Sequence, residues 1–137
     1  MIVSADFDFT VDTSGIDSLL QKHPQNKSRF LDAVAELVVT EMKDSFNTSP
    51  PGRAYDRADG RVHIASLPGY PPNTDYGDLI NSLRWERHGD VREIHGAEHG
   101  LYLEDSTELN RPFIGPAVAE VNKDVPALGK KYLVPSA

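Results

Sequence analysis

The sequence predicts an α+β fold, in which a small, mainly antiparallel sheet is packed by one long helix and a C-terminal helix. Three observations favour this fold class. Apolar residues recur at helical spacing over about 26–46 and again from 113 onward, and two short alternating segments, 84–88 and 91–96, flank a Gly-Asp turn. The length of 137 residues, 39% of them hydrophobic, suits a single domain over 1–137 with a sizeable core.

The N-terminal part of the chain predicts a strand followed by a short helix. Apolar and acidic residues alternate over 6–12, which is typical of a half-buried strand with an acidic outer face. Ser14 is expected to cap the short helix, with Asp17 as its partner in a capping box. Pro24 ends or restarts that helix, because proline lacks the N–H that a helix interior needs.

The strongest helical pattern covers about 26–46. Every fourth residue of this segment is apolar, which gives one continuous stripe: Phe30, Val34, Val38, Met42 and Phe46. We expect the stripe to face the core and the Pro-Pro-Gly sequence at 50–52 to end the helix.

A long loop rich in proline, glycine and arginine is predicted over about 50–75, with a brief strand at 62–64. Unstructured loops of this length are uncommon in compact domains and are usually functional or disordered. Two interpretations therefore stay open. The segment is either a surface loop without fixed structure or an arm that becomes ordered against a neighbouring molecule.

The second half of the chain predicts a short helix over 76–83, the two strands, and a further strand or turn at 101–104. Trp85, the only tryptophan, is expected in the core. Arg111 and Pro112 open the last helix, since proline suits the first helical turn. Pro126 kinks or ends this helix, which leaves a C-terminal tail over about 126–137.

Composition excludes several classes of protein. The chain has 14 Lys and Arg against 21 Asp and Glu, a net charge of −7, which argues against a protein whose main task is to bind nucleic acid. It has no cysteine, hence no disulfide and no thiolate chemistry. No segment resembles a secretion signal or a membrane span, so we expect a protein made in the cytoplasm and not bound to a membrane.

One motif suggests catalysis by zinc. His95, Glu98 and His99 fit the H-x-x-E-H pattern, in which two histidines on one helix face bind the metal and the glutamate activates water. Here the motif contains Gly96, is followed by Gly100 and comes after a predicted strand, all of which disfavour a helix. We therefore predict no metal site, no cofactor and no enzymatic activity, and a zinc-dependent hydrolase stays an alternative.

Four short motifs carry a resemblance to a known family. They are SPPGR at 49–53, SLPGYPP at 66–72, DYGDLINSL at 75–83, and the pair YLEDST at 102–107 with RPFIGPA at 111–117. In order and spacing they resemble the small minor tail, or tail-completion and neck, proteins of tailed bacteriophages. The resemblance extends over about 26–121, most of the chain.

This resemblance implies a structural virion protein, made in the host cytoplasm, that forms a ring at the head–tail junction. DNA would pass through the ring without specific binding, and an acidic bore would repel its backbone. The partners would be further copies of the chain and the neighbouring head-completion, connector, tail-terminator or tail-tube proteins. A sphere roughly 35 Å across represents a chain of this length, and six such spheres leave a hole of about duplex width. This estimate favours a hexamer, with a dodecamer as the alternative.

Subunit contacts are expected from the long loop and from the start of the last helix. The candidate interface residues are Arg53, Tyr55, Arg57, Arg61, Tyr70, Pro71, Pro72, Glu104, Arg111 and Phe113. The arginine-bearing loop would dock on an acidic patch of a neighbouring ring, and Arg111 would pair with Glu104 or Glu108. A small non-enzymatic adaptor that binds its partner through the same loop is the third alternative.

Overall fold

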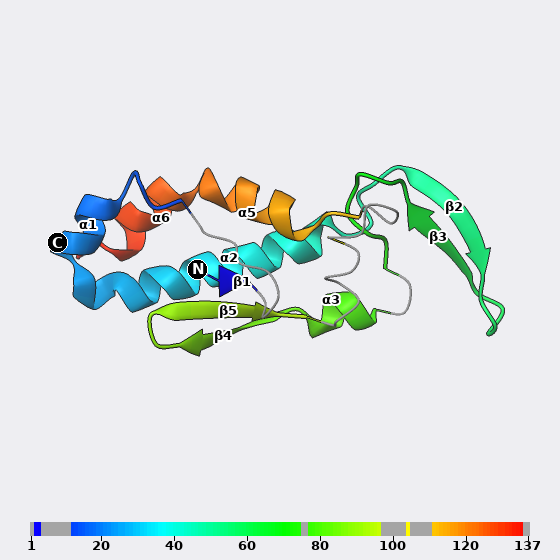
Figure 1. Ribbon diagram of the computed structural model, residues 1–137, viewed down its shortest axis with the longest axis horizontal. Helices are drawn as coiled ribbons and strands as arrows, with labels where there is room; N and C mark the ends of the chain where they lie inside the picture. Colours follow the sequence, from blue (N-terminus) through cyan, green and yellow to red (C-terminus); the bar gives the residue numbers. More distant parts are fainter. Residues whose placement is uncertain (1, 4–11, 75–76, 97–103, 105–110, 136–137) are drawn as a thin grey trace.

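The computed structural model describes residues 2–3, 12–74, 77–96, 104 and 111–135 (Figure 1). Of the predicted strand at 6–12, all but Asp12 lies outside the described residues, as do residues 101–103 and the second and third residues of the zinc motif, Glu98 and His99. Within the described part the fold is α+β, as the sequence predicts.

The molecule is elongated, and helix α2 (Lys27–Ser45) runs along its centre (Figure 1). On one side of α2 lies a three-stranded sheet in the order β1-β5-β4, with β1 at Ile2–Val3, β4 at Arg84–His88 and β5 at Val91–His95. β4 and β5 are antiparallel, whereas β1 pairs with β5 in parallel. On the other side lie α5 (Ile114–Asn122) and α6 (Val125–Tyr132). Short helix α3 (Asp78–Ser82) precedes β4.

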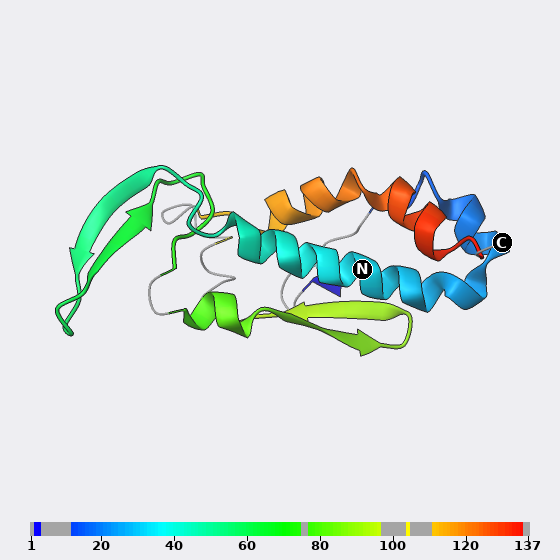
Figure 2. The ribbon, with the colours of Figure 1, turned by 180° about the vertical axis from the view of Figure 1, so that it is seen from behind.

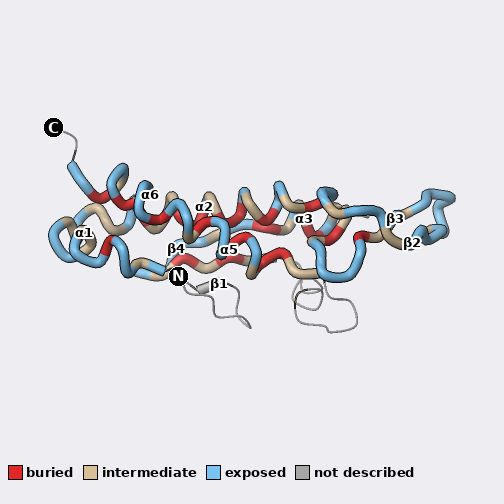
Figure 3. Tube along the Cα trace, turned by 90° about the horizontal axis from the view of Figure 1, so that it is seen from above, coloured by how far each residue is buried: buried red, intermediate tan, exposed pale blue. Residues whose placement is uncertain are grey.

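The core forms where α2 meets these two layers. All five residues of the predicted α2 stripe are buried, and they form one cluster with the apolar residues of α5. The rings of Phe46 and Phe113 pack edge to face, with their centroids 5.5 Å apart. Figure 3 shows the buried positions along the length of the body, on α2 and on the elements beside it.

The start of the chain differs from the prediction in its capping. α1 begins at Asp17 and ends at Lys22, and Ser14 does not cap it. Instead, the Asp12 carboxylate accepts a hydrogen bond from the backbone N–H of Ser14, and the Thr13 hydroxyl donates to Asp17. Asp12 therefore takes the local acceptor role that the sequence assigned to Ser14, because an Asx turn competes with the capping box. A short 3-10 helix at Pro24–Asn26 then restarts the helical path, as predicted.

The C-terminal segment is a helix and not a tail. Pro126 lies in the first turn of α6, where the missing N–H breaks no hydrogen bond. Leu133, just beyond α6, is fully buried, and its carbonyl accepts a hydrogen bond of 2.7 Å from the Asn26 side chain. The prediction of a tail from 126 was wrong because the proline starts a new helix instead of ending the ordered chain.

The predicted long loop is also corrected. Residues Pro51–Asp56 (β2) and Val62–Ser66 (β3) form an antiparallel hairpin, so the brief strand expected at 62–64 is confirmed and extended. Gly60, at φ 84°, provides the left-handed residue of the turn. We call the hairpin β2–β3 the arm, and Figures 1 and 2 show it projecting from one end of the body, opposite the end where α1 and α6 lie.

A buried arginine joins the sheet to α2. The Arg92 side chain on β5 is fully buried, and its Nε donates to Asp32 Oδ1 of α2 at 2.6 Å. Its remaining N–H groups donate to the Ser28 hydroxyl at 2.7 Å and to backbone carbonyls, including that of Gly89 at 2.8 Å. Arg87 donates to the other oxygen of Asp32. The guanidinium group is thus compensated in charge and hydrogen bonding, as burial requires.

Trp85 lies beside this network. Its ring is half-buried against the core, and its indole N–H donates to Glu36 of α2 at 2.7 Å. The residue therefore packs against the core, as expected, but at its edge, where its polar atom can reach Glu36.

Replacement of Asp32 by Asn is expected to destabilise the fold by about 2–4 kcal/mol, because the buried Arg92 guanidinium would lose its compensating charge. Urea unfolding followed by circular dichroism measures this difference. Asp44→Asn, an exposed position on the same helix, is the matched control and should change the stability little. Equal effects of the two substitutions would contradict the role assigned to Arg92.

The same pair also predicts how stability depends on pH. Burial alone would raise the pKa of Asp32, but hydrogen bonds and charge from Arg92 and Arg87 outweigh it and lower the pKa below its ordinary value. A lowered pKa in the folded state stabilises above the unfolded value of about 3.9 and stops doing so as the pH falls through the folded value. The stability difference between wild type and Asp32→Asn should therefore be constant near neutral pH and shrink below about pH 4. Urea titrations across this range test it, and a difference independent of pH would contradict it.

Candidate functional site

The arm is the strongest candidate for an interaction surface. Strand register places alternate residues on its two faces, with Ala54 opposite Ile64 and Tyr55 opposite His63. The first face therefore carries Tyr55 and His63, and the second face carries Ala54, Val62 and Ile64. The two faces differ in chemistry and both are largely exposed.

The first face is aromatic and basic. The guanidinium carbons of Arg53 and Arg57 lie 5.0 Å and 5.9 Å from the centre of the Tyr55 ring. Both arginines thus make cation–π contacts with one tyrosine that is itself 40% exposed. This arrangement holds two positive charges in place on an exposed strand, in a chain whose net charge is −7.

The second face is apolar. Val62 and Ile64 are 61% and 49% exposed, and they lie opposite Asp56 and Ala54. Of the six large apolar residues exposed in the described part of the chain, five lie between Tyr55 and Tyr70. Exposed apolar side chains gathered in one segment are typical of an interaction site, whereas isolated ones are not.

The base of the arm is fastened to the end of α2. Asn47 has a φ of 65°, a left-handed conformation that asparagine tolerates, and its side-chain oxygen accepts from the backbone N–H of Thr74 at 2.6 Å. Asn73 donates from its side chain to the Ile64 carbonyl at 2.9 Å. These bonds fix the direction in which the arm leaves the body. They also border a hollow of about 390 Å³ beside Val62 and Ile64.

The predicted interface residues divide into two groups. Exposed or half-exposed on or beside the arm are Arg53, Tyr55, Arg57, Arg61, Tyr70 and Pro71. Pro72 is buried, and its carbonyl accepts from the Asn47 N–H at 3.3 Å. Phe113 is only 1% exposed and belongs to the core. Pro72 and Phe113 therefore stabilise the fold and do not form a surface.

The Glu104 side chain caps α5 by binding backbone N–H groups at the start of that helix. Its two carboxylate oxygens accept from the N–H groups of Phe113 at 2.6 Å, Ile114 at 3.0 Å and Gly115 at 2.9 Å. These are the donors that the first turn of a helix leaves unsatisfied, and the helix dipole favours a negative charge there. The predicted ion pair of Arg111 with Glu104 or Glu108 stays a prediction, since Glu108 lies outside the described residues.

The zinc motif does not start on a helix. His95 is the last residue of β5, and Gly96 follows it outside any helix. The helical arrangement that would align His95 and His99 is therefore absent at the first ligand. A Cβ at Gly96 would lie 2.8 Å from the Leu83 side chain, which gives this glycine a packing role.

Comparison with protein-family models, with curated proteins and with solved structures gives no match. Among the described residues, no helix combines the length and the apolar character needed to cross a membrane. The described residues of the motifs of the phage resemblance lie at structural junctions: the start of the arm, its base, helix α3 and the start of α5.

Replacement of Glu104 by Ala is expected to lower the free energy of unfolding by about 1–3 kcal/mol, because three buried or half-buried N–H groups lose their acceptor. Glu104→Gln keeps one acceptor oxygen and should have an intermediate effect. Thermal and urea unfolding measure both variants. Glu120→Ala, which removes an exposed carboxylate from α5, the helix that Glu104 caps, is the control. A loss no larger than that of the control would contradict the capping role.

Proposed function

We propose that this protein is a structural subunit at the head–tail junction of a tailed bacteriophage, and that the arm is the element by which it docks on a neighbouring subunit. The observation that supports the proposal is the arm itself, a two-stranded hairpin that projects from the body (Figure 1). It has an exposed apolar face and an exposed basic face. The order and spacing of the four motifs provide the phage assignment.

The physics of a hairpin favours a docking role. A two-stranded hairpin is marginally stable in water on its own, and it becomes stable when a third strand or another surface covers one face. Val62 and Ile64 offer that face to a partner, and among the described strands β2 and β3 pair only with each other, so each has an edge that a further strand could join. The body gains nothing from keeping these side chains exposed, whereas an assembly would bury them.

The positive charges of the arm favour docking on an acidic surface. Arg53 and Arg57 are held on the arm, while the chain as a whole carries a net charge of −7. A basic arm on an acidic protein is complementary to the surface of another copy of the same chain, and to other acidic virion proteins. Repetition of such a head-to-tail contact generates a ring when the rotation closes.

The shape changes one expectation about the ring. The hexamer estimate treats the subunit as a sphere, and the described part of the chain is elongated (Figures 1 and 2). The number of subunits depends on how the long axis is tilted within the ring, so six is no longer favoured over twelve. A non-enzymatic adaptor would use the same arm, and it would bind one partner instead of forming a ring.

The double substitution Arg53→Glu with Arg57→Glu is expected to block incorporation of the chain into particles while leaving the body folded. The arm is remote from the core, so the circular dichroism spectrum should match that of wild type. Particles produced with the variant chain are purified and their content of this chain is measured by mass spectrometry. A second variant, Val62→Ser with Ile64→Ser, tests the apolar face in the same way.

Lys22→Glu with Lys43→Glu is the matched control, since it makes the same change in charge at exposed positions of the body. This control should be incorporated normally. Normal incorporation of both arm variants would refute docking by the arm. A wild-type chain that never enters particles, but forms a complex of fixed low stoichiometry with one cellular protein, would favour the adaptor.

A further inference from the structure

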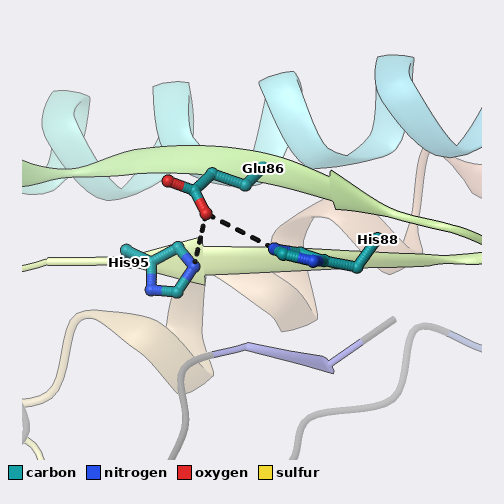
Figure 4. Close-up of side chains that lie close together, drawn as sticks. All are labelled: Glu86, His88 and His95. Atoms are coloured by element: carbon teal, nitrogen blue, oxygen red, sulfur yellow. Dashed lines mark hydrogen bonds and ion pairs between the residues drawn. The ribbon is translucent and has the colours of Figure 1, made fainter.

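The outer face of the β4–β5 hairpin brings together two histidines and two glutamates. Register pairs Glu86 with Glu93, and places His88 and His95 diagonally across the same face, away from α2 (Figure 4). The opposite face of the hairpin carries Trp85, Arg87 and Arg92, which bond to α2. The cluster is therefore a separate feature from the network that fastens the sheet to the helix.

The four groups alternate in chemistry around a common centre. Glu86 Oε2 lies 3.4 Å from His88 Nε2 and 3.4 Å from His95 Nε2. Glu93 Oε2 lies 3.3 Å from His88 Nε2 and 3.2 Å from His95 Nε2. One donor atom each from Glu86, His88 and His95 lies within 4.8 Å of the others. Each imidazole nitrogen thus lies between two carboxylate oxygens.

These separations suit metal ligands better than hydrogen bonds. Hydrogen bonds from nitrogen to oxygen have typical lengths of about 2.7–3.2 Å, and three of the four contacts are longer. In a tetrahedral zinc site with ligand distances of about 2.0–2.1 Å, neighbouring donor atoms lie about 3.3–3.4 Å apart. The separations of Glu86 Oε2 from the two imidazole Nε2 atoms, 3.4 Å each, match that spacing.

Two further observations point to a bound cation. His95 Nε2 is shielded from solvent and has no hydrogen-bond partner, although this atom faces the centre of the cluster. Glu86 and Glu93 are directly opposite each other across the strands, where like charges repel. A divalent cation between them would satisfy the histidine nitrogen and remove the repulsion.

The donor set indicates the class of metal. Imidazole nitrogen and carboxylate oxygen together suit zinc and the neighbouring divalent transition metals, whereas magnesium and calcium prefer oxygen ligands alone. Arg84 Nε lies 3.5 Å from Glu86 Oε1, so it contacts the glutamate oxygen that faces away from the two imidazoles. Glu86 Oε2 remains directed toward His88 and His95 (Figure 4).

We propose that Glu86, His88 and His95 bind a zinc-class divalent ion on the outer face of the β4–β5 hairpin. Glu93 lies beside this ligand set and contacts both imidazoles. The ion would join β4 to β5 at the middle of the hairpin and stabilise the sheet. This site differs from the H-x-x-E-H motif, with which it shares only His95. It does not depend on the proposed phage function.

The test is zinc binding to the full-length chain after chelator treatment. Titration with zinc chloride, followed by isothermal calorimetry, should give one ion per chain and a rise in melting temperature on binding. His88→Gln and Glu86→Gln should each weaken binding by at least about 100-fold, since even groups outside a ligand set contribute about 10–100-fold. Glu93→Gln should weaken zinc binding by a smaller factor, about 10–100-fold, because this carboxylate contacts both imidazoles from beside the ligand set. Magnesium chloride should give neither stoichiometric binding nor a rise in melting temperature.

Two control variants separate this site from others. His63→Gln, which removes a histidine on the arm, should bind zinc like wild type. His99→Gln removes a residue of the sequence motif and should also retain binding. Loss of binding in His99→Gln together with full binding in His88→Gln would assign the metal to the motif and overturn the proposal. Absence of stoichiometric zinc binding by a folded wild-type chain would overturn it as well.

Discussion

Helix α2 is covered on two sides, and this constraint determines what the rest of the molecule can do. Its apolar stripe packs against α5 and α6, while Arg92 fastens the β4–β5 hairpin to its other side through Asp32. Once both layers are in place, they cover the apolar surface of α2. The arm leaves the end of this helix, and within the described part of the chain Val62 and Ile64 on the arm are exposed.

Fold and proposed function are connected through this exposure. The hollow beside the arm is lined by apolar and basic side chains of the arm and by polar residues at its base. A docking role for the arm accounts for three observations together: the cation–π contacts of Tyr55, the hydrogen bond between Asn47 and Thr74 at the base of the arm, and the exposed apolar face. The outer face of the sheet points away from α2 and carries the histidines and glutamates for which we propose metal binding.

Local sequence signals predicted much of the body. Four-residue periodicity identified α2 and α5, and the Gly-Asp turn between alternating segments identified β4 and β5. The arm strands were mostly missed because arginine, proline and alanine interrupt the alternation that marks a half-buried strand. Arg92 was missed because charge suggests exposure, yet its alternation with Ile94 already placed it on the inner face. The cluster of Glu86 and His95 depends on strand register, which no single segment reveals. The place of Pro126 in the first turn of α6 was missed because it depends on the helix that follows the proline.

The central claim is that the arm is exposed in the free chain and covered in the assembly. Amide hydrogen exchange, read by mass spectrometry on the free chain and on purified particles, tests it most directly. The account predicts fast exchange over 51–66 in the free chain and strong protection in the particle, with α2 protected in both. Arm amides that exchange equally fast in the two states would contradict it.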